Sequence, residues 1–279
     1  MQKDQMLTRR RALLTGAAVV GAAGAAGLLV TGSGTDAARP AAPAAGAQAA
    51  GRPLKPSAYR LRPLTGYGPH QALLGRTQVR SAPLLRVSGR GSTMVLTFDD
   101  GPDPRYTPDI LDTLAAYDVR AMFFVCGEMV SHNKDLLVRM ADEGHVVGNH
   151  TWSHPLLTRL TRSRIRFEME RTSDIIEEEY GERPRWFRAP YGAWNRATFQ
   201  LGAELGMEPL AWTVDTLDWT SPGTRTIVDR VENGAAPGVV VLSHDAGGDR
   251  SQSVRALRAY LPELLASGYR VTVPRRQYV

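Results

Sequence analysis

Two adjacent carboxylates, Asp99 and Asp100, are the first side chains in this chain whose placement could support chemistry. They follow a short apolar run, residues 94–96, that is typical of a buried strand. Gly101 and Pro102 then end the strand in a turn. Two crowded carboxylates repel each other unless a cation or an arginine offsets their charge. The pair therefore indicates either a functional site at the end of a buried strand or an ordinary surface turn.

Two histidines, His150 and His154, lie four residues apart, so one turn of helix would bring both imidazoles to one face. With a carboxylate from another strand they would form a His₂Asp ligand set that leaves one position open for water. Such a set is typical of a catalytic metal site rather than a structural one. Paired loop histidines are common, and it is the Asp99–Asp100 pair that strengthens the metal hypothesis.

From residue 93 onward, strand-like and helix-like segments alternate. The predicted strands cover residues 94–98, 120–125, 145–148, 185–187, 209–214, 239–243 and 269–273. The predicted helices cover residues 107–117, 134–143, 163–180, 195–205, 225–232 and 253–266. This alternation predicts an α/β fold of parallel strands wrapped by helices, either a barrel or an open sheet.

Polar side chains follow five of the predicted strands, at the end where such folds carry their chemistry. They are Asp99 and Asp100, His150 and His154, Arg188 and Tyr191, then Asp215, Asp218 and Trp219, and finally His244 and Asp245. Because these clusters share one end of the sheet, we expect them to surround one site. Of these residues, Asp215 is expected to be structural, and His70, His132 and His145 elsewhere match no motif.

Five motifs resemble, in order, those of the polysaccharide deacetylases of carbohydrate esterase family 4, the NodB-homology domain. They read T-F-D-D-G-P at 97–102, H-T-W-S-H at 150–154, R-A-P-Y at 188–191, D-T-L-D-W at 215–219 and L-S-H-D at 242–245. The resemblance covers residues 93–273 and implies an α/β fold of the distorted (β/α)₇ barrel type. We therefore expect the deacetylase domain at 93–275.

The resemblance implies a metal centre and a pocket for the acetyl group. Asp100, His150 and His154 would bind a divalent metal, zinc in the first place, with Co²⁺ or Ni²⁺ as alternatives. The backbone N–H of Tyr191 would stabilise the oxyanion. The side chains expected to line the pocket around the acetyl methyl are those of Trp219 and Leu242.

Two acid–base pairs are also implied by the resemblance. Asp99 would be the general base, and Arg188 would hold its charge and orientation. His244 would be the general acid and Asp218 would orient it, because an amine leaves only when it is protonated and a carboxylate partner favours imidazolium.

The implied activity is metal-dependent removal of N-acetyl groups from N-acetylglucosamine residues of a polysaccharide, with release of acetate. Peptidoglycan is the first expected substrate, and chitin or chitooligosaccharide the second. Two alternatives stay open: an acetylxylan esterase of the same fold, and a non-catalytic domain that binds the cell wall.

The segment before the domain divides into three parts. Residues 1–31 join a basic start to a long Ala/Gly/Val/Leu run, which is typical of a signal peptide, or of an N-terminal anchor if the segment is retained. The arginine pair Arg9-Arg10 resembles a twin-arginine signal, although Ala12 stands where phenylalanine is usual. Residues 32–56 are predicted to be a disordered Ala/Pro linker, and 57–92 an extension that packs on the barrel.

The net charge of +6 favours an anionic neighbourhood such as an acidic cell wall. No nucleic-acid motif is present, so nucleic acid is not an expected partner. The one cysteine, Cys126, cannot form an internal disulfide and is expected to be a buried, inert thiol. We expect an exported monomer that acts in the wall or from the outer face of the cytoplasmic membrane, touching the membrane only through an uncleaved N-terminal segment.

Overall fold

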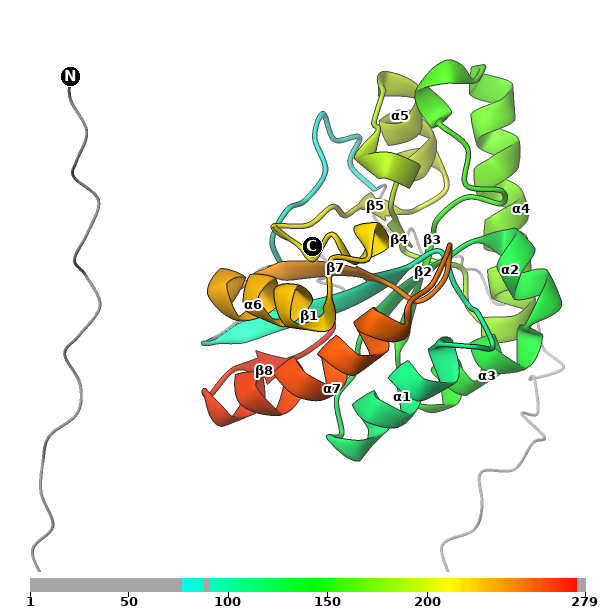
Figure 1. Ribbon diagram of the computed structural model, residues 1–279. Helices are drawn as coiled ribbons and strands as arrows, with labels where there is room; N and C mark the ends of the chain where they lie inside the picture. Colours follow the sequence, from blue (N-terminus) through cyan, green and yellow to red (C-terminus); the bar gives the residue numbers. More distant parts are fainter. Residues whose placement is uncertain (1–76, 88–90, 275–279) are drawn as a thin grey trace, which may run out of the picture. The chain divides into compact units, whose positions relative to one another are not determined.

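The computed structural model describes residues 77–87 and 91–274 (Figure 1). The predicted signal peptide or anchor, the predicted linker and residues 57–76 of the predicted extension lie outside these described residues. Within the described ranges, no helix has both the length and the apolar character needed to cross a membrane.

A curved sheet of parallel strands forms the centre of the described domain. Its strands lie in the order β5 (Glu208–Pro209), β4 (Trp186–Phe187), β3 (Val146–Asn149), β2 (Met122–Val125), β1 (Thr93–Asp99), β7 (Val240–His244) and β6 (Val214–Asp215), and β8 (Arg270–Val271) pairs with β1. Every pairing between these strands is parallel. The predicted fold class, an α/β distorted barrel, is confirmed.

The predicted strand over 209–214 is wrong in one respect, because it is two short strands at opposite ends of the sheet. β5 pairs with β4, and β6 pairs with β7. The sheet is therefore open between β5 and β6. Backbone groups of residues 84–87 form hydrogen bonds on both sides of this opening. Leu84 N donates to Pro209 O at 2.8 Å, and Val87 N donates to Gly238 O at 3.0 Å. The chain before β1 thus satisfies peptide groups that a continuous strand pairing would have used.

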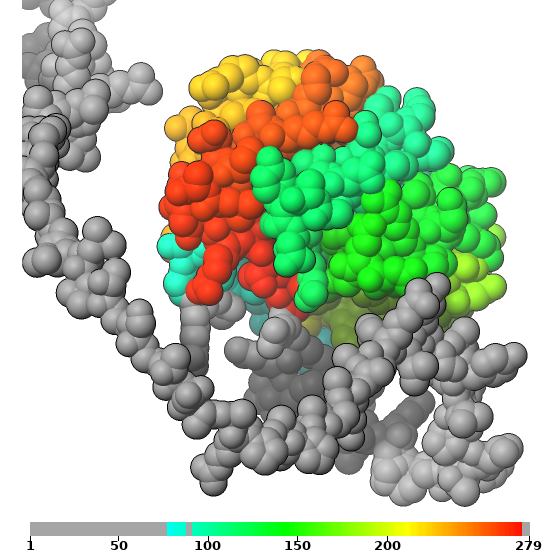
Figure 2. All heavy atoms as spheres, turned by 90° about the horizontal axis from the view of Figure 1, so that it is seen from below, coloured from blue at the N-terminus to red at the C-terminus, as the bar shows by residue number. Residues whose placement is uncertain are grey.

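Helices cover the outside of the sheet. They are α1 (Thr107–Ala116), α2 (Gly127–His132), α3 (Lys134–Asp142), α4 (Arg162–Tyr180), α5 (Arg196–Glu204), α6 (Thr224–Gly234) and α7 (Ser251–Ala266), with short 3₁₀ turns at Leu157–Arg159, Pro190–Gly192 and Asp218–Thr220. Seen from below, α7, α1 and α3 lie side by side (Figure 2). The short helix α2 was not predicted, since six residues are too few for a periodic pattern to show.

The long helix α4 has clear sequence signals at both ends. The Thr161 side chain accepts a hydrogen bond from Arg164 N at its start, which satisfies one of the free N–H groups there. Gly181 ends it with φ = 90°, a conformation that glycine adopts without steric cost. The buried face of α4 carries Ile165, Met169 and Ile176. Other side chains of this face contact the loop after β3.

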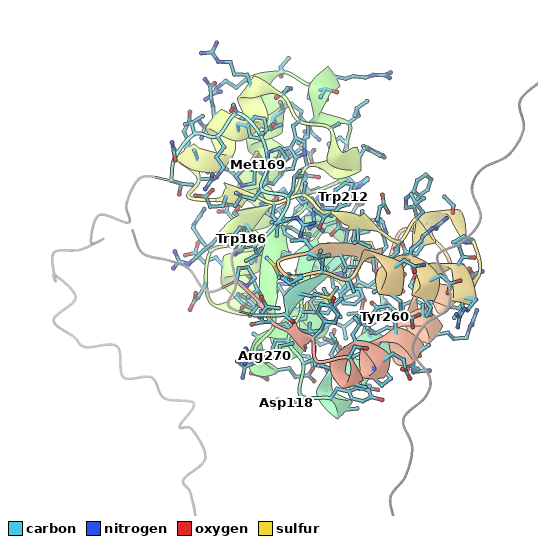
Figure 3. The ribbon with its side chains drawn as sticks, turned by 90° about the vertical axis from the view of Figure 1, so that its left-hand side faces the viewer. Asp118, Met169, Trp186, Trp212, Tyr260 and Arg270 are labelled. Carbon is cyan, nitrogen blue, oxygen red and sulfur yellow. The ribbon has the colours of Figure 1, made fainter. Side chains whose placement is uncertain are left out.

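The core beneath the helices divides into separate clusters. The largest lies under α1, α3, α6 and α7 and includes Phe98 and Phe123, whose rings stack at 5.3 Å, and Tyr260 of α7. A second cluster, around Met169 and Phe187, lies under α4 and α5. Figure 3 shows Met169 and Tyr260 well apart in these two regions. Strand β1 is buried from Met94 to Asp99, so a carboxylate at its end is held in a nearly water-free position.

Candidate active site

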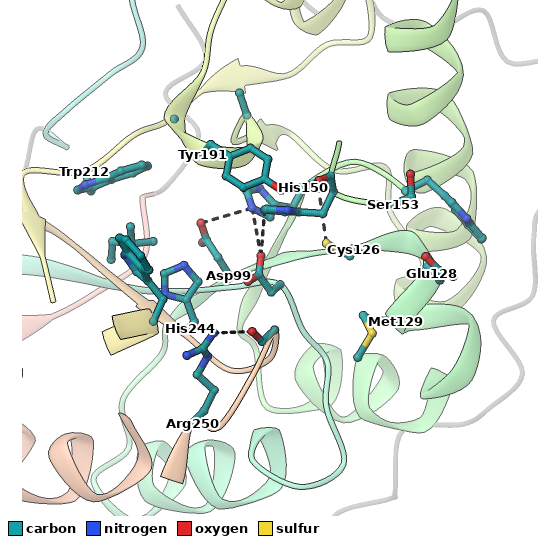
Figure 4. A pocket seen from close by; sticks show the side chains of 18 of the residues that line it. Asp99, Cys126, Glu128, Met129, His150, Ser153, Tyr191, Trp212, His244 and Arg250 are labelled. Atoms are coloured by element: carbon teal, nitrogen blue, oxygen red, sulfur yellow. Dashed lines mark hydrogen bonds and ion pairs between the residues drawn. The ribbon is translucent and has the colours of Figure 1, made fainter. Parts of the chain in front are cut away.

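The carboxyl ends of the central strands surround a cavity of about 650 Å³ (Figure 4). Eight of the ten predicted site residues line it: Asp99, Asp100, His150, His154, Tyr191, Trp219, Leu242 and His244. Arg188 and Asp218 are buried directly behind, in contact with Asp99 and His244. The strand ends therefore do bring together the side chains that the sequence placed at one edge of the sheet.

Three potential metal ligands converge on one side of this cavity. Asp100 Oδ1 lies 3.5 Å from Nε2 of His150 and 3.3 Å from Nε2 of His154. Ligand atoms about 2.1 Å from a tetrahedral ion lie about 3.4 Å apart, so both distances suit the shell of an ion such as Zn²⁺, and the potential ligand atoms of the three residues all lie within 4.8 Å of one another. Asp100 Oδ1 is buried and makes no hydrogen bond within the described part of the chain. A buried carboxylate oxygen left in this way is what a cation would satisfy.

The protonation of these ligands also suits a metal. Burial raises the pKa of Asp100, but the contact with His150 and the charges of the nearby imidazoles lower it to about 2. Burial, together with the neighbouring His150, lowers the pKa of His154. Of the three potential ligands, Asp100 is therefore a carboxylate and His154 a neutral imidazole at neutral pH, the forms that bind cations. Nδ1 of His150 donates to the backbone O of Arg188 at 2.8 Å, which leaves Nε2 as the free ligand atom.

The two histidines do not converge on a turn of helix, and that prediction is wrong. Residues 150–156 form an irregular loop in which Thr151 (φ 71°) and His154 (φ 54°) adopt left-handed conformations. The buried carboxylate of Glu168, on α4, accepts the backbone N–H groups of Trp152 at 3.1 Å and Ser153 at 2.9 Å. Glu168 thereby holds the loop in the shape that turns both imidazoles toward Asp100.

A buried ion pair lies beside the ligand set. Arg188 Nη1 donates to Asp99 Oδ1 at 2.6 Å and to Thr97 Oγ1 at 2.8 Å. Its Nε and Nη2 donate to the backbone carbonyls of Leu210 at 3.1 Å and Ala211 at 3.0 Å. The guanidinium is completely buried, and its bonds leave Oδ2 of Asp99 directed at the cavity, 3.7 Å from His150 Nε2. Asp99 is thus an oriented carboxylate with one oxygen available.

A second pair lies at the end of the neighbouring strand β7, where His244 is the register partner of Asp99. His244 Nδ1 donates to Asp218 Oδ1 at 2.7 Å, and Ser253 Oγ donates to Oδ2 of the same carboxylate at 2.6 Å. Burial lowers the pKa of His244, but the bond to Asp218 and the charges of Asp218, Asp99 and Asp100 raise it to about 9. The imidazole is therefore protonated at neutral pH, with Nε2–H left to face the cavity.

The remaining predicted residues form the cavity rim and wall. Tyr191 has φ = 60°, and its backbone N–H has no backbone partner among the described residues. Its ring is exposed and meets that of His154 edge-on at 4.6 Å. Leu242 is buried in β7 and Trp219 is half exposed, so together they give the cavity an apolar side next to its polar centre.

Two residues at the site were not assigned roles from the sequence. Asp245 is buried and accepts hydrogen bonds from Gly101 N at 3.1 Å and Thr107 Oγ1 at 2.6 Å. Burial raises its pKa to about 7, and the charges of Asp100 and Asp99 add to that effect. The sequence feature that could have drawn attention to Asp245 is its position directly after His244. Glu168 could have been found as a charge within the apolar face of its helix.

The other residues noted in the sequence take structural positions. Asp215 Oδ1 accepts a bond from Leu217 N at 2.8 Å. Cys126 is buried at the cavity wall with Sγ 3.8 Å from His150 O, and burial raises the pKa of its thiol well above the usual value. A thiol in that state is a poor nucleophile.

Comparisons with known proteins agree with this geometry. The polysaccharide deacetylase family profile matches residues 86–210. A peptidoglycan-N-acetylglucosamine deacetylase of Bacillus cereus is 40% identical over 188 residues, covering 64% of this chain and 85% of that protein. A chitooligosaccharide deacetylase of a Bradyrhizobium species is 40% identical over 197 residues, covering 66% and 90%. The crystal structure of the Bc1960 peptidoglycan N-acetylglucosamine deacetylase, with a bound N-oxidanyl-benzamide, has a TM-score of 0.65 at 36% identity, covering 67% of this chain and 88% of that one.

Proposed function

The chain belongs to the polysaccharide deacetylase family, and on that premise we propose that it is a metal-dependent hydrolase that removes acetyl groups from N-acetylglucosamine residues of peptidoglycan. The observation that carries the proposal is the placement of two buried acid–base pairs, Asp99–Arg188 and Asp218–His244, at the ends of the neighbouring strands β1 and β7, beside one cavity that also holds a His₂Asp set. A binding module has no need for such pairs, because burying charge is costly unless it is put to use.

The proposed metal ligands are Asp100, His150 and His154, and zinc suits a site of two imidazoles and one carboxylate. When bound there, the ion would polarise the amide carbonyl and make water a better nucleophile at neutral pH. Glu168 and the carbonyl of Arg188 keep the ligands in position. The other steps can be assigned to side chains of the chain itself.

Asp99 is proposed to take the proton from the attacking water. Its Oδ1 is held by Arg188, so Oδ2 is the basic atom that faces the cavity. The tetrahedral oxyanion needs donors that are already in place, and the N–H of Tyr191, which has no backbone partner among the described residues, is proposed as such a donor at the rim. Leu242 and Trp219 would receive the methyl group of the acetyl.

His244 is proposed to give its Nε2 proton to the sugar nitrogen as the carbon–nitrogen bond breaks. The products are acetate and a free amine on the sugar. The step needs an imidazolium at the start, which is the state that the raised pKa of His244, about 9, provides. Asp218 accepts the Nδ1–H throughout and so keeps the acidic proton on the nitrogen that faces the substrate.

Peptidoglycan is proposed as the polymer because a relative with that substrate in its name is matched over 85% of its own length, and because a chain of net charge +6 suits an anionic wall. The similarity to a chitooligosaccharide deacetylase supports neutral N-acetylglucosamine oligomers as a second substrate class. The acetylxylan esterase alternative requires the same groups around an ester carbonyl.

We further propose that the protein is exported and works as a monomer in the wall or from the outer face of the membrane. The support is the basic, then apolar, N-terminal sequence with its Arg9-Arg10 pair. Changing both arginines to lysine should leave a twin-arginine substrate inside the cell. Unchanged export would assign the segment to general secretion instead.

Acetate release from peptidoglycan, N-acetylchitooligosaccharide and acetylxylan, measured side by side, tests the proposed function. We expect release from the first two, loss of activity after chelation, and recovery on adding Zn²⁺ or Co²⁺. Release from acetylxylan alone would replace the proposal with the esterase alternative. Full turnover by a preparation shown by elemental analysis to be metal-free would overturn the metal assignment.

A further inference from the structure

An arginine of α4 lies over an aromatic ring of the loop that carries His150 and His154. The Cζ atom of Arg171 is 3.5 Å from the centroid of the Trp152 ring. Trp152 stands between His150 and His154 in the chain and lines the cavity. A guanidinium over an indole ring is attracted by its π-electrons and is held in a fixed orientation. Arg171 is therefore a cation held against a residue that lines the cavity.

The indole ring is not an open stacking surface for a sugar. Arg171 covers one face, and Gly127 packs so closely that a Cβ there would lie 2.4 Å from Cε3 of Trp152. The ring instead supports the guanidinium and fills the wall between α2 and α4. Of this pair, it is Arg171, whose side chain is exposed, that can meet a ligand.

Neighbouring arginines of α4 are engaged by carboxylates, whereas Arg171 is not. Arg164 Nη2 lies 2.8 Å from Glu168 Oε1, and Arg166 Nη1 lies 2.9 Å from Glu170 Oε1. No ion pair of Arg171 exists among the described residues, and Glu128, which lines the same cavity, forms none with it. The planar N–H groups of Arg171 remain available for an anion that arrives from outside.

We propose that Arg171 binds a carboxylate carried by the sugar next to the one that is deacetylated. This inference rests on the proposed function and deepens it. In peptidoglycan the neighbouring sugar bears an acidic lactyl or peptide substituent, and in chitin it bears none. A guanidinium can hold a carboxylate through two parallel hydrogen bonds, which gives both affinity and orientation. Arg171 therefore distinguishes an acidic N-acetylated polymer from a neutral one.

The test measures binding in the metal-loaded Asp99→Asn chain, in which turnover is suppressed. The ligands are a tetrasaccharide of alternating N-acetylglucosamine and N-acetylmuramic acid and the same compound with its carboxylates methyl-esterified. We expect Arg171→Gln to raise Kd about 2–5-fold for the acid, the range for an exposed charge pair of good geometry, and to leave Kd for the ester unchanged. Arg171→Lys should recover part of the loss, and added salt should narrow the difference.

The matched control is Arg183→Gln, which removes the same charge just beyond α4, where Arg183 pairs with Asp174 and Glu177. It should change Kd for neither ligand. An equal loss with acid and ester would give Arg171 a merely structural role. No change with either ligand would show that it contacts no substrate. Both results overturn the inference.

Failure of this inference is distinguishable from failure of the proposed function. If the wild type releases acetate from these oligosaccharides while Arg171→Gln binds both ligands normally, the inference falls and the proposed function stands. If the selective binding defect is found but the wild type releases no acetate from any N-acetylated sugar, the activity is wrong and Arg171 still binds a carboxylate.

Discussion

The backbone carbonyl of Arg188 accepts a 2.8 Å hydrogen bond from Nδ1 of His150. The side chain of the same arginine donates to Asp99 Oδ1 at 2.6 Å. One buried residue thus orients a proposed metal ligand through its backbone and the proposed base through its side chain. A change at Arg188 should therefore affect both the stability of the fold and the chemistry.

Replacing Arg188 with glutamine should leave Asp99 buried without its cation. Removing one partner of a buried ion pair typically costs about 3–5 kcal/mol of the free energy of unfolding. Urea unfolding of the metal-free wild type and variant measures this cost. Arg166→Gln, which removes a half-buried arginine of α4 that pairs with Glu170 and Glu204 at the surface, is the control and should change stability little. Equal stability of the wild type and Arg188→Gln would contradict the role given to the buried pair.

Glu168→Gln should weaken metal binding without touching a ligand. The amide of glutamine has the same shape as the carboxylate but only one acceptor oxygen. The two oxygens of Glu168 accept the N–H groups of Trp152 and Ser153 and pair with Arg164. Loss of such supporting contacts typically lowers metal affinity about 10–100-fold. Competition with a chelator measures the Zn²⁺ affinity. Glu170→Gln, two residues along the helix and paired only at the surface, should bind zinc like the wild type.

The pH dependence should reveal the charge of His244. Its folded pKa, about 9, lies above the ordinary value of 6.5, so the protonated form is favoured in the fold. The acid is present below that pKa and is lost as pH rises through it, which gives kcat/KM an alkaline limb. A bound divalent cation would move this limb below 9 by electrostatic repulsion. In Asp218→Asn the imidazolium loses its partner carboxylate, so the limb should move to lower pH still. A limb that does not move would show that His244 is not the titrating group.

The same shift predicts how stability varies with pH. Because the pKa of His244 is raised on folding, its contribution to the free energy of unfolding is fully present below pH 6.5 and disappears as pH rises toward 9. Metal-free wild type should lose stability over that window, and Asp218→Asn should lose less. Parallel curves for the two proteins, from denaturant unfolding at several pH values, would contradict the coupling between His244 and Asp218.

Much of the site was predictable because strand ends and residue types are local features. Asp99, His150, Arg188 and His244 each follow a buried strand, and parallel strands bring their ends together. The convergence of His150 and His154 was predicted for the wrong reason. The prediction assumed a turn of helix, but an i, i+4 spacing does not show whether the backbone is helical. The conformation of the loop depends on its contact with Glu168, which lies further along the chain. The spacing of apolar residues does not predict such a contact.

The opening in the sheet between β5 and β6 could not be predicted from the pattern of apolar residues either. Residues 209–214 are apolar enough to suit one buried strand, yet they divide between two edges. The division depends on backbone bonds from Leu84 and Val87, in a segment whose own pattern is irregular. A pairing made between segments that are far apart in the chain is decided by tertiary structure and not by local preference.

The central claim is that Asp99 is the base and His244 the acid of a metal-dependent deacetylase. The most direct test measures kcat/KM for Asp99→Asn and His244→Ala on an N-acetylglucosamine oligomer and on an activated aryl acetate, with metal content determined alongside. Losing a positioned proton-transfer group typically costs about 10²–10⁴ in rate. We predict that both variants keep the metal and that Asp99→Asn is impaired on both substrates. His244→Ala should be severely impaired on the amide and much less on the aryl ester, whose leaving group needs no proton. Equal loss on the two substrates by His244→Ala would contradict the assignment of His244 as the general acid.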